Sequence, residues 1–177
     1  MQTILIKTSA IHGRGVFAAR SFHEGEIILE IDDSHIVEDE STLTKEDWEF
    51  NVDCFDGKTV IMQEPERSIN HSCDPNSYTR TVDGVRKVIA RRDIVAGEEL
   101  TYDFTINGDN EGAFPCHCGA KRCRGTYLGD FFKLPLEFQI EYLPYLEVWF
   151  VEQHRDRIAA LMSSQDGVGC LISHGKE

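Results

Sequence analysis

The sequence predicts a mainly β fold with short helices, followed by helices at the C-terminal end. Along residues 1–110, short apolar runs alternate with turn signals that contain glycine, a pattern typical of short strands. After Asp130 the sequence becomes apolar-periodic and free of glycine over residues 134–162, which favours helices. The 177 residues suffice for one domain with an appendage and a buried core.

The elements of the first part are short and are separated by turns. Strands are predicted at 2–7, 16–31, 58–62 and 85–94. Turns are predicted at "HGRG" (12–15), "FHEGE" (22–26), "VDGV" (82–85) and "VAGEE" (95–99). A short helix is predicted over 41–48, with Ser41 or Thr44 as its N-cap, because a hydroxyl side chain can accept a hydrogen bond from the first free N–H groups.

Two helices are predicted in the second part, roughly over 135–142 and 145–162. Pro135 fits the first turn of a helix, and Pro144 should end the first one. The second helix carries an apolar stripe that we assign to the core: Leu146, Trp149, Phe150, Ile158 and Leu161.

Charge and targeting signals restrict the class of partner. The net charge of −13 disfavours direct binding to nucleic-acid phosphates and suits a basic partner such as a lysine-rich peptide, although solubility alone would also explain it. No apolar run approaches the roughly 20 residues of a membrane span, and the N-terminus does not resemble a secretory signal. We therefore expect an intracellular chain with reduced cysteines and no membrane association.

Three cysteines lie close together in "PCHCGAKRCRG" (115–125), with the spacing CxCx4C. Cys116, Cys118 and Cys123 could be buried independently, but clustered cysteines in an intracellular chain more often bind zinc. A structural zinc site needs a fourth ligand, and the candidates are His117, Cys54, Cys73 and Cys170. His117 lies between two ligands and should point away from the metal, and the spacing does not decide among the others. Nearby cations that suit a thiolate cluster are Lys121, Arg122 and Arg124.

Four motifs occur in one order along the chain: "HGRGVFAAR" (12–20), "RSINHSCDPNSY" (67–78), "RRDIVAGEELTYDF" (91–104) and CxCx4C. With these motifs, residues 3–128 resemble the SET-domain family of lysine methyltransferases with a post-SET motif, and most resemble the group that methylates the histone H3 tail. The resemblance implies a SET-domain β-clip of several small sheets with a pseudoknot. The implied divisions are a SET domain (1–110) and a post-SET zinc segment (111–130). Outside the resemblance, the sequence pattern predicts a C-terminal helical extension (131–163) and a flexible tail (164–177).

The resemblance also implies a function and a set of partners. The implied activity is an S-adenosylmethionine-dependent protein-lysine N-methyltransferase, acting on a lysine in a basic, histone-like peptide. The implied cofactors are S-adenosyl-L-methionine as cosubstrate and one structural Zn²⁺, for which Cys73 completes the ligand set. We expect a monomer, cytoplasmic or, in a eukaryote, nuclear.

The site residues follow from the same resemblance. The cofactor-binding residues would be His12, Arg14, Trp48, Asn70, His71, Tyr102 and His117. The substrate channel would contain Phe50, Tyr78 and Phe104, and Tyr102 would be catalytic. Such a channel must favour the neutral lysine, whose free pKa is about 10.4, and must aim its amine at the methyl group.

Two positions depart from the family pattern. The motif that usually ends in a catalytic tyrosine reads "ELTYDF" here, so Phe104 replaces that tyrosine. Trp48 stands where the resembling group often has tyrosine. Both changes remove hydroxyl groups, and they keep two alternatives open: a SET-fold enzyme that acts on a small molecule or on S-adenosylmethionine itself, and a weakly catalytic module that binds cofactor or peptide.

Overall fold

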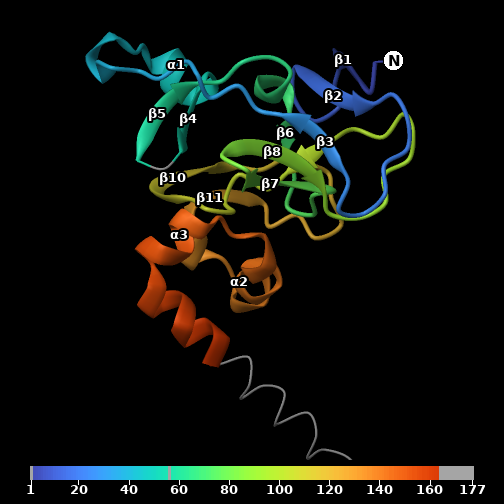
Figure 1. Ribbon diagram of the computed structural model, residues 1–177. Coiled ribbons are helices and arrows are strands. Elements are labelled where there is room, and N and C mark those ends of the chain that lie inside the picture. The colour runs from blue at the N-terminus through green and yellow to red at the C-terminus, as the bar shows by residue number, and fades with distance from the viewer. Residues whose placement is uncertain (1, 56, 164–177) are drawn as a thin grey trace, which may run out of the picture. The chain divides into compact units, whose positions relative to one another are not determined.

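The computed structural model describes residues 2–55 and 57–163, and gives only the backbone at 49, 50 and 54 (Figure 1). The strands are β1 (Ile4–Thr8), β2 (Arg14–Ala18), β3 (Ile27–Glu30), β4 (Val52–Phe55), β5 (Lys58–Ile61), β6 (Asn70–His71), β7 (Ser77–Val82), β8 (Val85–Ala90), β9 (Thr101–Tyr102), β10 (Asp109–Pro115) and β11 (Thr126–Asp130). The α-helices are α1 (Lys45–Phe50), α2 (Leu136–Tyr142) and α3 (Val148–Gln153), and residues 155–163 are also helical. The 3-10 helices are η1 (Glu40–Thr42), η2 (Glu66–Ser68), η3 (Phe131–Lys133) and η4 (Leu143–Tyr145).

Most of these strands form separate small sheets, which confirms the predicted mainly β fold with C-terminal helices. The sheets are β1-β2, β3-β8-β7, β4-β5, β6-β9 and β10-β11. A core of buried apolar side chains packs among the first strands: Val16, Ala18, Phe22, Ile28, Ile31, Ile69, Val88, Ala90, Ile94 and Leu100. The threading of the predicted pseudoknot stays a prediction.

The antiparallel hairpin of β7 and β8 turns at Asp83 and Gly84, whose φ angles are 53° and 78°. Positive φ at both central residues is the turn geometry that matches the twist of a two-residue hairpin. The predicted turn at 82–85 is therefore confirmed. The predicted strand over 85–94 is too long, because β8 ends at Ala90 and the chain then bends to pair Ile94 with Phe22.

The parallel pair β6-β9 joins two of the sequence motifs. Asn70 lies opposite Thr101, and His71 lies opposite Tyr102. Buried Asn76 secures this junction: its Nδ2 donates to the Glu99 carbonyl at 2.8 Å, and its Oδ1 accepts from the Thr101 N–H at 2.9 Å. Residues about 30 positions apart in the sequence are thereby held side by side.

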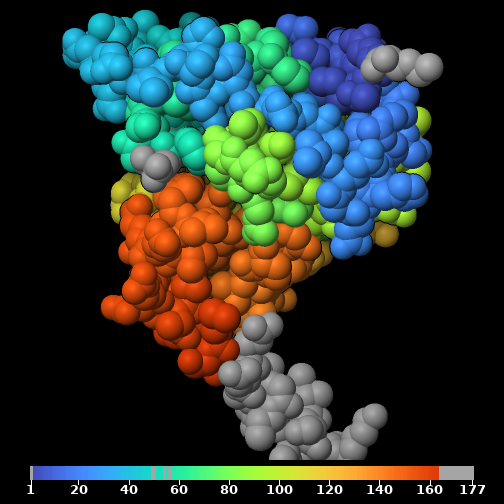
Figure 2. All heavy atoms as spheres, viewed as in Figure 1, coloured from blue at the N-terminus to red at the C-terminus, as the bar shows by residue number. Residues whose placement is uncertain are grey.

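The short helix α1 begins where the sequence indicates. Thr44 is its N-cap and forms a capping box with Asp47, in which each side chain bonds to the other residue's backbone N–H. Ser41 instead lies in η1, which is capped by Asp39. Most residues of η1 and α1 are exposed, and this part of the chain (cyan) forms surface in Figure 2.

The chain divides into two compact units. Among the described residues, those from 2 to 104 together with 114–127 form the first unit, and 105–113 together with 128–163 form the second. Each unit has an apolar cluster of its own. The predicted flexible tail (164–177) and Cys170 lie outside the described residues.

The helices of the second unit only partly match the prediction. Helix α2 confirms the predicted helix at 135–142, and it ends before Pro144. The single helix predicted at 145–162 is wrong, because α3 starts at Val148 and the chain turns at His154 before it becomes helical again. At the start, the N–H of Glu147 bonds to the Asn107 side chain at 2.7 Å, which holds Glu147 extended. At the break, the His154 ring packs against Phe150, with centroids 4.5 Å apart.

The predicted apolar stripe is confirmed as core. Leu146, Phe150 and Ile158 are buried members of the apolar cluster of the second unit, and the partly buried Trp149 and Leu161 pack against it. The fully buried Phe131 and Tyr142 belong to the same cluster. Among the described residues, no helix is both long enough and apolar enough to cross a membrane.

Replacing Phe150 by alanine should destabilise the second unit by about 3–5 kcal/mol, because it removes a fully buried ring that packs edge-on against Phe131. Urea unfolding followed by helical circular dichroism measures this loss. Val148→Ala is the matched control on the same helix, since Val148 is 68% exposed, and it should change stability by less than about 0.5 kcal/mol. Equal effects of the two substitutions would contradict this assignment of the core.

Candidate active site and metal centre

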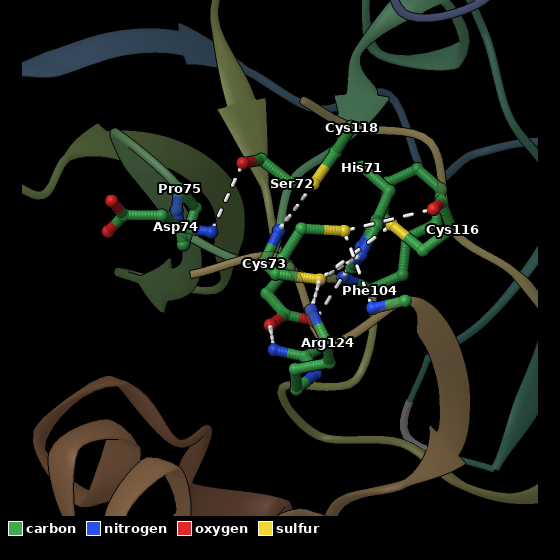
Figure 3. Close-up of polar contacts among 12 residues, drawn as sticks. His71, Ser72, Cys73, Asp74, Pro75, Phe104, Cys116, Cys118 and Arg124 are labelled. Carbon is green, nitrogen blue, oxygen red and sulfur yellow. Dashed lines mark hydrogen bonds and ion pairs between the residues drawn. The ribbon is translucent and has the colours of Figure 1, made fainter. Parts of the chain in front are cut away.

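Four cysteines from distant segments come together in the first unit. The sulfurs of Cys73, Cys116, Cys118 and Cys123 all lie within 4.8 Å of one another. The Sγ atoms of Cys73 and Cys116 are 3.7 Å apart (Figure 3). Four sulfurs about 2.3 Å from a zinc ion form a tetrahedron with edges of about 3.8 Å, so the arrangement fits zinc.

Backbone N–H groups point at these sulfurs. Cys73 donates to Cys118 Sγ at 3.5 Å, Arg124 donates to Cys73 Sγ at 3.5 Å, and Gly125 donates to Cys123 Sγ at 3.4 Å. Such donors stabilise the negative charge of metal-bound thiolates. Arg124 acts on Cys73 in both predicted ways: its backbone N–H donates to the sulfur, and its positive charge lowers the pKa of the thiol, in opposition to burial.

The thiols need a cation to ionise together. Burial raises the pKa of the Cys73 thiol well above its usual range and that of Cys116 to about 11. Burial also raises the pKa of Cys118, but hydrogen bonds to its sulfur outweigh this effect and lower the pKa to about 7. The largest contributions come from the N–H groups of Cys73 and Ala120. A bound metal would displace the remaining protons, so metal affinity should fall with falling pH.

His71 connects the cysteine cluster with the "YDF" motif. Its Nδ1 accepts from the Phe104 N–H at 3.3 Å, which leaves the proton on Nε2, and Nε2 lies 3.4 Å from Cys73 Sγ (Figure 3). Burial lowers the pKa of His71 to about 4, although the charge of Asp103 acts in the opposite direction. The ring is therefore neutral at physiological pH and donates to the sulfur. Because both nitrogens are engaged, the predicted contact of His71 with the cofactor would use the main chain.

A buried ion pair connects the hairpin that carries Cys116, Cys118 and Cys123 to the "YDF" motif. The Arg124 guanidinium donates to both carboxylate oxygens of Asp103, at 2.6 and 3.0 Å. The Asp103 side chain is completely buried and that of Arg124 is 7% exposed. Asp103 lies between Tyr102 and Phe104, so this pair fixes the hairpin that carries three of the cysteines relative to both aromatic side chains.

The glycine loop and the "NHSC" motif meet at Asn70. Its Nδ2 donates to the carbonyl oxygens of His12 (3.2 Å) and Arg14 (2.9 Å) and to Glu99 Oε1 (2.8 Å). A Cβ at Gly15 would lie 2.3 Å from Glu99 Oε1, so a side chain there would displace this carboxylate from Asn70. The structure thus brings together three of the predicted cofactor-binding residues, and the role itself stays a prediction.

Aromatic rings from three segments gather beside His71. The Tyr102 and Phe104 rings are 5.0 Å apart, and Phe104 lies 5.3 Å from His71 and 6.3 Å from Tyr127. Burial raises the pKa of Tyr102 well above its usual range, and the charges of Glu66 and Asp53 add to this. Tyr102 is therefore a neutral phenol that can orient an amine by hydrogen bonding, as predicted for the channel.

A buried charge cluster lies within electrostatic reach of this phenol. Arg86 pairs with Asp33 at 2.6 Å, with Asp53, and with Glu66 at 3.5 Å. Burial raises the pKa of Glu66 to about 8, in spite of Arg86, so this carboxyl group is mainly protonated at neutral pH.

The remaining predicted cofactor and channel residues differ in their exposure and in their nearest partners. Trp48 lies on α1 with 47% of its surface exposed, and the guanidinium of Arg80 lies 5.5 Å from the Tyr78 ring centroid on β7. His117 is exposed, as expected for a residue that points away from the metal. The side chains of Phe50 and of Cys54 lie outside the described residues.

Sequence reasoning missed Glu99, Asp103 and Tyr127. Glu99 and Asp103 lie inside a motif that was recognised for its tyrosine, and their burial against Asn70 and Arg124 depends on tertiary contacts. Tyr127 follows the last cysteine by four residues, and an aromatic residue directly after a metal-ligand motif was the available signal.

The profile of the SET domain family matches residues 13–105, which is more than half of the chain. The chain belongs to the SET domain family. The match contains the glycine loop, the "NHSC" motif and "YDF", and the four-cysteine cluster adds a segment after this SET domain.

Several curated relatives share this SET domain. Histone-lysine N-methyltransferase 2B of Homo sapiens is 37% identical over 139 residues, which cover 70% of this chain and 5% of that protein. Histone-lysine N-methyltransferase trithorax of Drosophila virilis is 38% identical, covering 66% and 3%. The H3 lysine-4 specific enzyme of Saccharomyces cerevisiae is 34% identical, covering 69% and 13%. The chain thus spans only a small part of the length of these relatives.

One solved structure from Plasmodium falciparum also aligns with the chain. It covers 59% of this chain and 94% of its own, at 20% identity and a TM-score of 0.48.

Replacing Arg124 by leucine should destabilise the first unit by about 3–5 kcal/mol, because it leaves the Asp103 carboxylate buried without its partner. Chemical denaturation of the purified protein measures this change. Lys133→Leu is the control, since Lys133 pairs with a Glu111 side chain that is 97% exposed, and such pairs contribute at most about 1 kcal/mol. A loss of less than about 1 kcal/mol for the Arg124 variant would show that the pair does not hold the segment.

Proposed function

We propose that this chain is an S-adenosylmethionine-dependent protein-lysine N-methyltransferase that acts on a lysine in a basic, histone-like peptide. The observation that carries the proposal is the junction at His71, where the "NHSC" motif, the "YDF" motif and the cysteine cluster contact one another. Membership of the SET domain family supports it, as does the similarity to relatives that are histone-lysine N-methyltransferases.

The cofactor would lie at the glycine loop and Asn70. The cofactor supplies an activated methyl group on a sulfonium. Gly13 has a φ of 45° and open space where a side chain would stand, so the backbone there is accessible to a ligand. Asn70 holds this loop through the carbonyl groups of His12 and Arg14. Trp48, Tyr102 and His117 complete the proposed cofactor contacts.

The substrate lysine would enter between aromatic side chains. Tyr102 would orient the neutral amine through its hydroxyl group, and Phe104 would form an apolar wall with Phe50 and Tyr78. Exclusion of water by these rings disfavours the ammonium form and so promotes attack by the amine. Alignment of amine, methyl and sulfur would supply most of the rate.

The cysteine cluster would hold one structural Zn²⁺. Four sulfur ligands leave no open position for catalysis, so the ion would act by fixing residues 114–127. Those residues include Arg124 and its contact with Asp103.

The substrate class follows from charge and from the relatives. A net charge of −13 favours a basic peptide over a nucleic acid. A histone substrate would place the protein in the nucleus of a eukaryotic cell. The oligomeric state that we propose is a monomer.

The decisive test is methyl transfer from labelled S-adenosylmethionine to histones and to basic peptides, with mass spectrometry of the products. We expect labelled lysine in the wild-type protein. Tyr102→Phe should lower kcat by at least about 100-fold, because it removes the orienting hydroxyl group. Tyr145→Phe removes a hydroxyl group from the second unit and should have no effect.

The same experiment discriminates the second candidate function. Phe104 lacks the hydroxyl group expected in a lysine channel, which favours a SET-fold enzyme acting on a small molecule or a module that only binds. Methylated metabolites without labelled protein would support the former. Cofactor binding without any product would support the latter, and either result would refute the proposed substrate.

Removal of zinc should weaken cofactor binding, because the hairpin of residues 114–127 is fixed to the "YDF" motif through Cys73 and Arg124. Calorimetry should record at least about a tenfold rise in the Kd of S-adenosylmethionine after chelation. Re-addition of zinc should restore the original value and serves as the control. Unchanged affinity in protein shown to be zinc-free would contradict the proposed coupling.

A further inference from the structure

The ring at position 104 occupies a central place in the aromatic cluster but carries no hydroxyl group. Phe104 contacts Tyr102 and His71, with centroid distances of 5.0 and 5.3 Å, and 36% of its surface is exposed. Orientation of an amine by two hydrogen bonds requires a second oxygen near the Tyr102 hydroxyl group. Phe104 has none, so a second hydroxyl group in the channel would have to come from another residue.

Tyr127 packs directly against the Phe104 ring. Its ring meets Phe104 edge-on at 75° with centroids 6.3 Å apart, and it meets His71 at 5.6 Å. Tyr127 is 8% exposed, because Phe114 stacks on it with centroids 4.4 Å apart. Phe114 is 50% exposed and therefore shields Tyr127 from water on that side.

The two phenols lie within electrostatic reach of each other. The pKa of Tyr102 is raised by burial first, then by Glu66 and Asp53, and also by the phenol group of Tyr127. Arg86 is the cation that opposes these effects. Tyr102 on β9 and Tyr127 on β11 also pack against the same ring, that of Phe104, which places both phenols in one aromatic cluster.

The position of Tyr127 is fixed by the cysteine hairpin. The N–H of Cys116 bonds to the Gly125 carbonyl at 3.0 Å and closes the hairpin two residues before Tyr127. Arg124, three residues before it, is tied to Asp103. A residue whose preceding backbone is anchored in this way loses little freedom when a substrate binds, as a positioning residue requires.

We propose that Tyr127 supplies the second hydroxyl group of the lysine channel, in place of the one that Phe104 lacks. Tyr127 is thus a positioning residue for the substrate amine, and the cysteine cluster presents it to the site. This inference rests on the proposed methyl transfer. It means that the segment after the SET domain positions the substrate amine in addition to its structural role.

The first test measures binding and does not depend on turnover. The probes are S-adenosylhomocysteine and an S-adenosylmethionine analogue that carries an amine in place of the sulfonium methyl group. The amine of the analogue should form hydrogen bonds in the channel. Tyr127→Phe should therefore raise the Kd of the analogue about 3- to 10-fold relative to the Kd of S-adenosylhomocysteine. Tyr145→Phe is the matched control and should leave this ratio of dissociation constants unchanged.

The second test is rescue within the same channel. Tyr127→Phe should lower kcat by about 10- to 100-fold with little change in the KM of the peptide. Adding Phe104→Tyr to that variant should restore at least part of the lost kcat, because the hydroxyl group returns to the neighbouring ring. A purely structural role for Tyr127 predicts no rescue, and thermal unfolding of each variant verifies that the fold is intact.

The outcomes separate this inference from the proposed function. An unchanged binding ratio in Tyr127→Phe, or an unchanged kcat, would overturn the role of Tyr127. Wild-type protein that transfers no methyl group would overturn the proposed function, and the binding ratio would still decide whether Tyr127 lines the channel.

Discussion

The site depends on one buried ion pair, between Asp103 and Arg124. Two completely or nearly completely desolvated charges are tolerated only when their geometry is good, and here both carboxylate oxygens accept from the guanidinium. The pair joins the strand that carries Tyr102 to the hairpin that carries three cysteines. Its geometry therefore sets where the hairpin can close and which rings it brings to Phe104.

His71 adds a second, weaker connection at the same junction. Its neutral imidazole accepts a hydrogen bond from the Phe104 N–H and donates one to the Cys73 sulfur. A shift of the Cys73 sulfur would therefore move the imidazole and, through it, the backbone of the "YDF" motif. The surroundings of Cys73 and Cys116 oppose ionisation of these two thiols without a cation. Metal binding to the four cysteines would therefore be coupled to formation of the aromatic site.

The sequence was sufficient to predict most of the local chemistry. The N-cap at Thr44, the Asp83–Gly84 turn, the end of α2 before Pro144 and the four clustered cysteines all depend on residue type and short spacing, or on a motif. The His154 ring at the break packs against the distant Phe132 ring, and the burial of Asp103 and of Tyr127 depends on partners at least 13 residues away in the sequence. Such contacts leave no periodic signal, so the pattern of single residues could not reveal them.

Glu99 shows how closely these positions constrain one another. One carboxylate accepts from Ser9 at 2.7 Å and from Asn70 at 2.8 Å, and it occupies the space that a side chain at Gly15 would need. A change at any of these four positions alters what the other three can tolerate. In a lineage of related chains, they should therefore be replaced as a set or not at all, so that substitutions at 9, 15, 70 and 99 carry shared rather than independent evolutionary information.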